Sequence, residues 1–152
     1  MKKSAAGSFS FNLSLPCVRE GTGESCRTPE DVRRLLADTA DLAQEAFTVI
    51  TLNRKNKVID RHLVTLGLLD ASLIHSREVF RPAIGDGASS VIISHNHPSS
   101  DPTPSSEDLA ITRRLVESGR VLDIRVLDHV IVGRGTTPHF SIRESGLVSF
   151  EG

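Results

Sequence analysis

The fold of this chain is decided by the stretch Val91-Ile92-Ile93-Ser94-His95-Asn96-His97. Its β-branched beginning predicts a central strand that is covered on both faces of a sheet. Alternate side chains of a strand point to the same side, so His95 and His97 can converge on one point. The stretch therefore predicts a buried strand with a pair of histidines at its end.

A loop with three prolines follows this strand and leads into a helix. The prolines restrict the paths open to the loop, and Ser105 begins a helix that we expect to end near Gly119. Asp108 lies in the first turn of that helix, close enough to join His95 and His97. Two imidazoles and one carboxylate can form a three-ligand metal site with room for water. The working hypothesis is a zinc hydrolase.

The same residues also have a purely structural interpretation. Many histidines bind no metal, and Asp108, three residues after Ser105, could form a helix capping box with that serine. The proline-rich loop could simply connect a strand to a helix. The metal site is favoured because α/β sheets place ligands at the carboxyl ends of their strands. Both interpretations remain open on the residues alone.

The rest of the chain alternates helices and strands. Thr28 and Pro29 are favourable at a helix start, and the apolar spacing predicts a helix to about Gln44. A hairpin is expected from its two β-rich runs, with strands over 47–52 and 58–64. A short helix is expected to start after Ser76 and to stop at Gly85-Asp86-Gly87. Further strands are expected over 121–128, 129–132 and 139–142, with a helix over 143–147 and an edge strand over 8–15. This order predicts an α/β fold, a mixed, curled β-sheet flanked by helices.

Composition suits a folded chain of 152 residues, with 38% hydrophobic and 24% charged residues. We expect a strand and loop extension over 1–27 and a single domain over 28–152. No apolar run approaches membrane-spanning length, so we expect a cytoplasmic protein without membrane contact. The formal net charge of −1 gives no support for nucleic-acid binding. Cys17 and Cys26 are expected to be reduced thiols, and a bridge between them is the alternative.

The histidine pair and the residues after it resemble the JAMM (MPN-type) metalloprotease motif, His-x-His-x7-Ser-x2-Asp with a glutamate upstream. Over about residues 45–148 the chain resembles the JAMM domain of RadC proteins. The matching segments are Asp70-Ala71-Ser72, Arg77-Glu78-Val79-Phe80, His95-Asn96-His97-Pro98-Ser99, Asp101-Pro102-Thr103-Pro104-Ser105 and Leu127-Asp128-His129-Val130-Ile131-Val132-Gly133. The resemblance implies the three-layer MPN/JAMM architecture, which is similar to that of cytidine deaminases.

The resemblance also implies a site. One Zn²⁺ would be held by His95, His97 and Asp108, with water as fourth ligand. Ser105 matches the serine that supports the developing oxyanion. Glu45 matches the upstream glutamate, the general base, because it directly precedes the first core strand. The implied reaction is hydrolysis of a peptide or isopeptide bond in an unidentified protein substrate.

Several positions depart from the RadC pattern or compete with its assignments. Glu78 is a second candidate for the upstream glutamate, but a favourable contact with the helix dipole explains it. Ser100 replaces a glycine, which strains the loop if that position needs a positive φ. Ser76 replaces a proline, and residues 1–44 lack the helix-hairpin-helix pattern of longer RadC proteins. His129 is either a support for the site or a core histidine.

Two other functions are compatible with these residues. A non-catalytic RadC-like module would bind DNA or a repair or replication protein, and it would need neither Glu45 nor Ser105. An Fe(II) oxygenase would use the same ligand types, two histidines and one carboxylate. Such oxygenase sites occur mainly in all-β barrels, whereas this chain is expected to be α/β.

Overall fold

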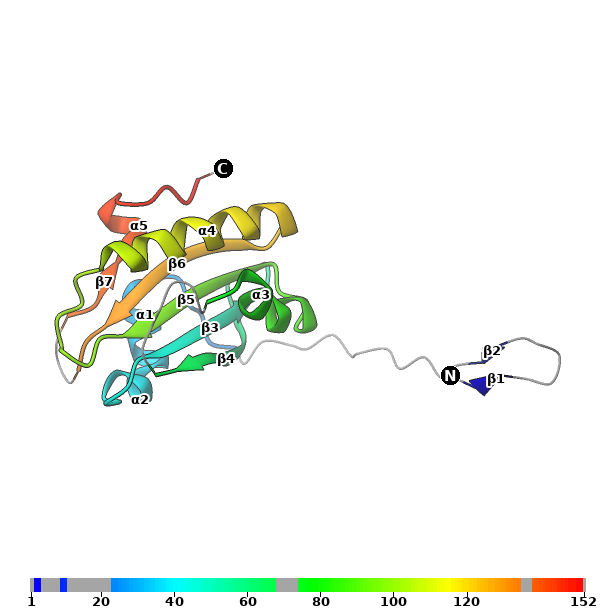
Figure 1. Ribbon diagram of the computed structural model, residues 1–152, viewed down its shortest axis with the longest axis horizontal. Coiled ribbons are helices and arrows are strands. Elements are labelled where there is room, and N and C mark those ends of the chain that lie inside the picture. The colour runs from blue at the N-terminus through cyan, green and yellow to red at the C-terminus, as the bar shows by residue number, and fades with distance from the viewer. Residues whose placement is uncertain (1, 4–8, 11–22, 68–73, 135–137, 152) are drawn as a thin grey trace.

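The computed structural model describes residues 2–3, 9–10, 23–67, 74–134 and 138–151. Its main feature is a five-stranded sheet in the order β4-β3-β5-β6-β7 (Figure 1). The strands are β3 (Ala46–Leu52), β4 (Val58–Leu66), β5 (Ser90–Asn96), β6 (Arg125–Val132) and β7 (Phe140–Ser141). The matched segment 70–72 lies outside the described residues.

The sheet is mixed, as the order of elements predicts. β3 pairs antiparallel with both β4 and β5, whereas β5 pairs parallel with β6. A parallel pair needs a crossover connection, and helix α4 (Ser106–Leu122) provides it. All seven residues of β5 are buried, which confirms the central strand expected from its β-branched beginning.

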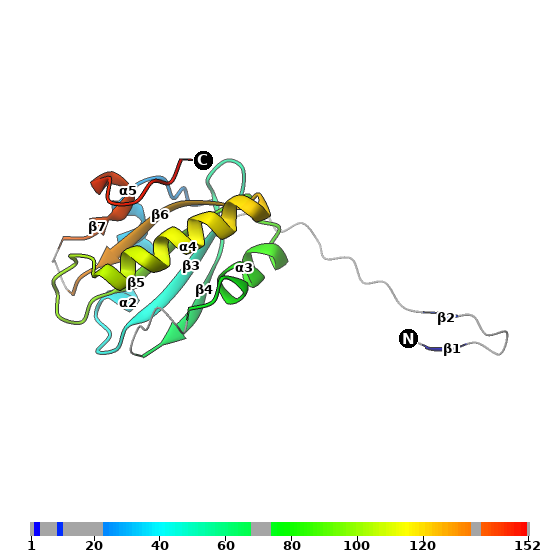
Figure 2. The ribbon, with the colours of Figure 1, turned by 45° about the horizontal axis from the view of Figure 1, so that its top comes forward.

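Helices cover both faces of this sheet. Helix α3 (Ser76–Gly85) and α4 pack on one face, where Phe80 and Leu115 join a core with Ile93 of β5. Helices α1 (Pro29–Leu35) and α2 (Ala37–Ala40) pack on the other face, where Val32 contacts a second core that includes Ile92. Figures 1 and 2 show the sheet between these two helix layers. The predicted three-layer α/β architecture is confirmed.

Two helix boundaries differ from the predictions. The helix expected to run to Gln44 is interrupted at Leu36, whose ψ of 22° is not helical, and its second part ends at Ala40. The helix expected to end near Gly119 continues to Leu122, because Gly119 lies against β6 and not at a cap. The predicted strands over 121–128 and 129–132 are therefore one strand that begins at Arg125. The last helix, α5, is Ile142–Ser145, slightly earlier than expected.

The amino-terminal part forms a separate two-stranded sheet of β1 (Lys2–Lys3) and β2 (Phe9–Ser10). Of the edge strand expected over 8–15, these two residues of β2 are described, and they pair with β1 instead of the main sheet. Cys17 lies outside the described residues. Cys26 is a buried free thiol, and burial raises its pKa to about 12. Within the described ranges, no helix has the length and apolarity needed to cross a membrane.

Candidate metal centre

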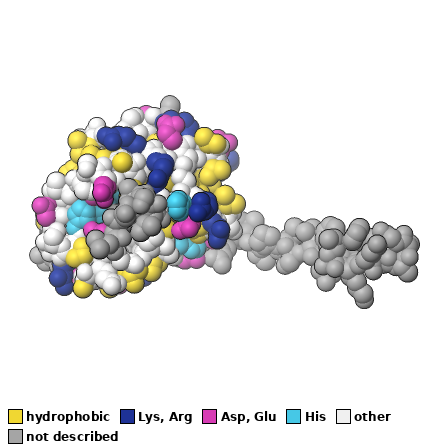
Figure 3. Space-filling view, viewed as in Figure 1, with side chains coloured by type: hydrophobic (Ala, Val, Ile, Leu, Met, Phe, Trp, Pro, Cys, Tyr) yellow, Lys and Arg dark blue, Asp and Glu magenta, His cyan; other side chains and the backbone are white. Residues whose placement is uncertain are grey.

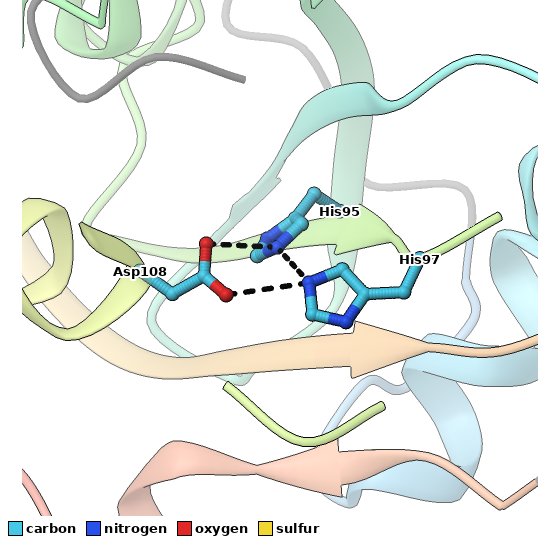
Figure 4. A group of neighbouring side chains, drawn as sticks. All are labelled: His95, His97 and Asp108. Carbon is cyan, nitrogen blue, oxygen red and sulfur yellow. Dashed lines mark hydrogen bonds and ion pairs between the residues drawn. The ribbon is translucent and has the colours of Figure 1, made fainter. Parts of the chain in front are cut away.

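His95, His97 and Asp108 converge at the carboxyl end of β5, as Figure 4 shows. The Nε2 atoms of the two histidines are 3.0 Å apart. Asp108, in the first turn of α4, places Oδ1 3.2 Å from His95 Nε2 and Oδ2 3.3 Å from His97 Nε2. The three side chains expected to meet from their spacing are therefore brought together by the end of a strand and the beginning of a helix.

The loop between strand and helix folds back through its own hydrogen bonds. The Ser100 N–H donates to the carbonyl of His97 over 2.9 Å, and Ser100 has a φ of 70°. The position does need the left-handed conformation, as its usual glycine indicates, and the serine adopts it. Asp101 then accepts hydrogen bonds from the N–H and hydroxyl of Thr103. These turns return the chain to the start of α4.

Asp108 both caps helix α4 and belongs to the ligand group. Its Oδ2 accepts a hydrogen bond from the Ser105 N–H over 2.8 Å, and the Asp108 N–H donates to Ser105 Oγ over 3.1 Å. This reciprocal pair is a capping box. The two interpretations of the sequence are therefore compatible, because the cap fixes the rotamer that points Asp108 toward His95 and His97.

The site is electrostatically suited to a cation. The side chains of His95 and Asp108 are 0% and 4% exposed, and that of His97 is 13% exposed. Burial alone would lower the pKa of His97, but contacts with Asp108 and Asp101 and the charge of Glu45 raise it. Burial likewise opposes ionisation of Asp108, yet its contacts with the two histidines lower its pKa. A positive charge at their meeting point is thus stabilised.

The ligand atoms of His95, His97 and Asp108 fit zinc. In a tetrahedral site with Zn–N and Zn–O bonds of about 2.0–2.1 Å, neighbouring ligand atoms lie about 3.3 Å apart. The two Nε2 atoms are 3.0 Å apart, and each lies close to that value from its own carboxylate oxygen of Asp108, His95 Nε2 at 3.2 Å from Oδ1 and His97 Nε2 at 3.3 Å from Oδ2. His97 Nδ1 is 2.8 Å from the carbonyl oxygen of Asp101, which can only accept, so Nδ1 has the hydrogen. In neutral His97 the lone pair is therefore on Nε2, directed toward Asp108 and His95.

Glu45 lies close enough to the same site for its charge to act on His97. It directly precedes β3, in which Phe47 is paired with His95. Its side chain is partly buried, and its negative charge contributes to the raised pKa of His97. Glu78, the competing glutamate, is exposed on the first turn of α3. The proximity of Glu45 to His97 supports the choice of Glu45 over Glu78 as the upstream acid.

Two neighbours of the site were not recognised as such from the sequence. Asn96 lies between the two histidines, and its amide bonds the backbone of Gln44 and Ala46, on either side of Glu45. Thr112, on the buried face of α4, bonds His129, which in turn bonds His95. His129 is completely buried, and burial followed by the charge of His95 lowers its pKa well below the ordinary value. A polar residue at a buried helix position is the signal that could have identified Thr112.

A second group of possible ligands is formed by Asp60, His62 and Asp86. His62 Nε2 lies 2.6 Å from Asp86 Oδ2, and the hydroxyl of Thr51 donates to the same carboxylate atom. Hydrogen bonds from the His62 ring and the Thr51 hydroxyl to the Asp86 carboxylate account for this arrangement. His62 is therefore hydrogen-bonded at a place distinct from the histidine pair.

The fold and this arrangement of side chains define a mixed α/β domain of the JAB/MPN class. The family model for a RadC-like JAB domain matches residues 26–147, so the chain belongs to the RadC-like JAB domain family. This confirms the resemblance inferred from the motif.

Curated relatives agree with that assignment. A UPF0758 protein of Caldanaerobacter subterraneus subsp. tengcongensis is 49% identical over 133 residues, which are 87% of this chain and 56% of the relative. One of Symbiobacterium thermophilum is 57% identical over 110 residues, 72% of this chain and 46% of the relative. One of Geobacillus thermodenitrificans is 50% identical over 123 residues, 80% and 54% of the two chains. The chain thus spans about half the length of these relatives, whose names state no activity.

Proposed function

We propose that this chain is a zinc-dependent hydrolase that cleaves a peptide or isopeptide bond in a protein substrate. The observation that supports this most strongly is the convergence of His95 Nε2, His97 Nε2 and both carboxylate oxygens of Asp108. A bound zinc ion would be held by these three residues, one ion per chain, and it would lower the pKa of a bound water from about 15.7 to about 7.

Glu45 acts in this proposal as the general base and acid. It accepts the proton of the attacking water and then donates it to the leaving amine. Its partly buried position, close enough to His97 for its charge to act on that ring, suits this role. A binding-only module would have no use for an acid at this position.

Ser105 acts as an oxyanion donor. Its Oγ accepts the hydrogen bond of the Asp108 N–H, so the hydrogen of its hydroxyl can point away from the helix. The residue is exposed at the beginning of α4, where a substrate carbonyl has access. Loss of one such donor typically raises the barrier by roughly 2.7–4 kcal/mol.

Nucleic-acid binding is less well supported. On the face shown in Figure 3, acidic and basic side chains are interspersed and not gathered by sign. The formal net charge is −1, whereas a nucleic-acid footprint is a basic patch. An iron site would use the same donors, and measuring catalysis with each metal separates that alternative from zinc.

Cleavage of a degenerate peptide library tests the proposal. The zinc-loaded chain is incubated with the library in ¹⁸O-labelled water, and mass spectrometry detects new carboxyl groups that contain ¹⁸O. We expect Glu45→Gln to retain zinc and to reduce the rate by about 10²–10⁴-fold. Glu78→Gln is the matched control and should cleave like the wild type. A Glu45→Gln variant as active as the wild type would refute the proposed role.

A further inference from the structure

A buried chain of hydrogen bonds connects His95 Nδ1, the ring nitrogen that faces away from His97 and Asp108, to helix α4. His95 Nδ1 is 2.8 Å from His129 Nε2, and His129 Nδ1 is 2.6 Å from Thr112 Oγ1. Thr112 Oγ1 is in turn 2.6 Å from the backbone carbonyl oxygen of Asp108. The exposed fractions are at most 3% along the whole chain of residues. Because water is excluded, these groups can satisfy one another only in a consistent order of donors and acceptors.

The order of donors and acceptors is fixed where the chain of hydrogen bonds reaches the Asp108 carbonyl. A backbone carbonyl can only accept, so the Thr112 hydroxyl donates its single hydrogen to Asp108 O. Toward His129, Thr112 Oγ1 must then accept, and the hydrogen of that contact is on His129 Nδ1. The direction of the first two bonds follows from the chemistry of the groups alone.

The order continues to His95 because His129 is neutral. Its side chain is 0% exposed, and its ring nitrogens contact a hydroxyl and an imidazole, not a carboxylate. An imidazolium there would be a fully buried charge with no carboxylate in contact with its ring, which is strongly unfavourable. With its only N–H at Nδ1, His129 accepts through Nε2. His95 therefore donates from Nδ1, and its lone pair is on Nε2, facing His97 and Asp108.

We propose that Thr112 and His129 are positioning residues that fix the tautomer of His95, so that its Nε2 is a ready metal ligand. Asp108 is at both ends of this arrangement, since its carboxylate faces Nε2 of His95 and its carbonyl anchors the chain behind the ring. Together with the Asp101 carbonyl, which accepts from His97 Nδ1, the hydrogen-bond chain fixes the tautomers of both imidazoles before any metal ion binds. The statement about the tautomer is independent of hydrolysis, whereas its effect on zinc rests on the proposed function.

The tautomer can be measured directly in the metal-free protein. Nitrogen-15 NMR of histidine-labelled protein distinguishes a protonated Nδ1 from a protonated Nε2, at a pH where His95 is neutral. We expect the Nδ1–H form for both His95 and His129 in the wild type. In Thr112→Val, the Nδ1–H of His129 loses its acceptor, so His129 should shift toward the Nε2–H form. His95 would then accept at Nδ1, and its hydrogen would move to Nε2, the atom that faces the metal site. Wild-type His95 in the Nε2–H form would overturn the proposal.

Zinc affinity provides the second measurement, by competition with a chelator. Loss of a partner of this kind typically weakens metal binding about 10–100-fold, and we expect that range for Thr112→Val. Thr112→Ser keeps the hydroxyl and should restore affinity. Thr51→Val is the matched control, because Thr51 is also 0% exposed and hydrogen-bonded, but to Asp86.

The outcomes separate this inference from the proposed function. If Thr112→Val binds zinc within about twofold of the wild type, or loses no more affinity than Thr51→Val, the positioning role is wrong. His129→Gln provides a second variant, since its amide can accept from His95 and donate to Thr112, and it should retain most of the affinity. If the wild type itself bound no zinc, the proposed function would fail, while the NMR result would still decide the tautomer.

Discussion

Asn96 Oδ1 accepts a hydrogen bond from the backbone N–H of Ala46 over 2.6 Å, at a residue that is 0% exposed. The same amide donates from Nδ2 to the carbonyl of Gln44 over 2.9 Å. Because Asn96 lies between His95 and His97, one strand fixes both the histidine pair and the segment that contains Glu45.

Asn96→Ala should therefore loosen Glu45 without removing the ligands. The variant leaves buried backbone groups unpaired, and we expect a loss of about 1–3 kcal/mol in the free energy of unfolding. Hydrogen exchange of the segment 42–46 should accelerate. Ser94→Ala is the control, because Ser94 lies on the same strand as Asn96 and loses a buried hydrogen bond to the Val130 carbonyl of β6. Equal acceleration of the segment 42–46 in both variants would refute a specific role for Asn96.

Ser100→Gly should relieve strain in the loop of the site. Ser100 has a φ of 70°, which glycine adopts without the penalty of roughly 1–2 kcal/mol that a side chain incurs there. We expect the free energy of unfolding to rise by about 0.5–1 kcal/mol, after the greater chain entropy of glycine is subtracted. Ser99→Gly, at a neighbouring residue without a positive φ, should give no gain in urea unfolding. A Ser100→Gly variant less stable than Ser99→Gly would contradict the strain.

Stabilisation by zinc should increase with pH. The pKa of His97 is raised above 6.5, so protonation of His97 stabilises the metal-free fold below that pH. This contribution is lost as the pH rises through the raised pKa, whereas zinc requires the neutral imidazole. Asp108, with its lowered pKa, stays ionised throughout this range.

The difference in melting temperature with and without zinc tests this pH dependence. We expect it to be larger near pH 8 than near pH 6. A larger zinc shift at the lower pH would show that His97 does not compete with protons for the metal.

Gly119→Ala should destabilise the helix that contains Asp108. A Cβ atom at this position would lie 2.4 Å from the Ile124 carbonyl oxygen, a backbone group that cannot move alone. We expect a loss of about 1–3 kcal/mol in the free energy of unfolding. Gly85→Ala is the matched control, because a Cβ there meets no atom within 4 Å. Similar stabilities for the two variants in thermal unfolding would contradict the close approach of Gly119 to the Ile124 backbone.

Local patterns predicted the parts of the fold that depend on local chemistry. The β-branched run before His95 predicted the central strand, and Thr28 with Pro29 predicted the start of α1, where a capping box is found. The end of α4 was misjudged because Gly119 usually signals a helix end, whereas here it permits close packing.

The site residues divide in the same way, into those that local sequence patterns predict and those that depend on contacts between distant segments. The meeting of His95, His97 and Asp108 could be expected, since strand alternation and a short loop bring them together. The contact between His95 and His129 joins parallel strands 34 residues apart, and no sequence spacing specifies that register. The amide of Asn96 bonds Ala46 and Gln44, which are 50 and 52 positions away and which only the pairing of β3 with β5 brings near.

Zinc content tests the central claim most directly. The chain is loaded with excess zinc and desalted, and metal and protein are quantified together. We predict about one zinc per chain for the wild type and for His139→Ala, a control histidine near Glu30, and under about a tenth for His97→Ala. Zinc in the wild type no higher than in His97→Ala would contradict the account.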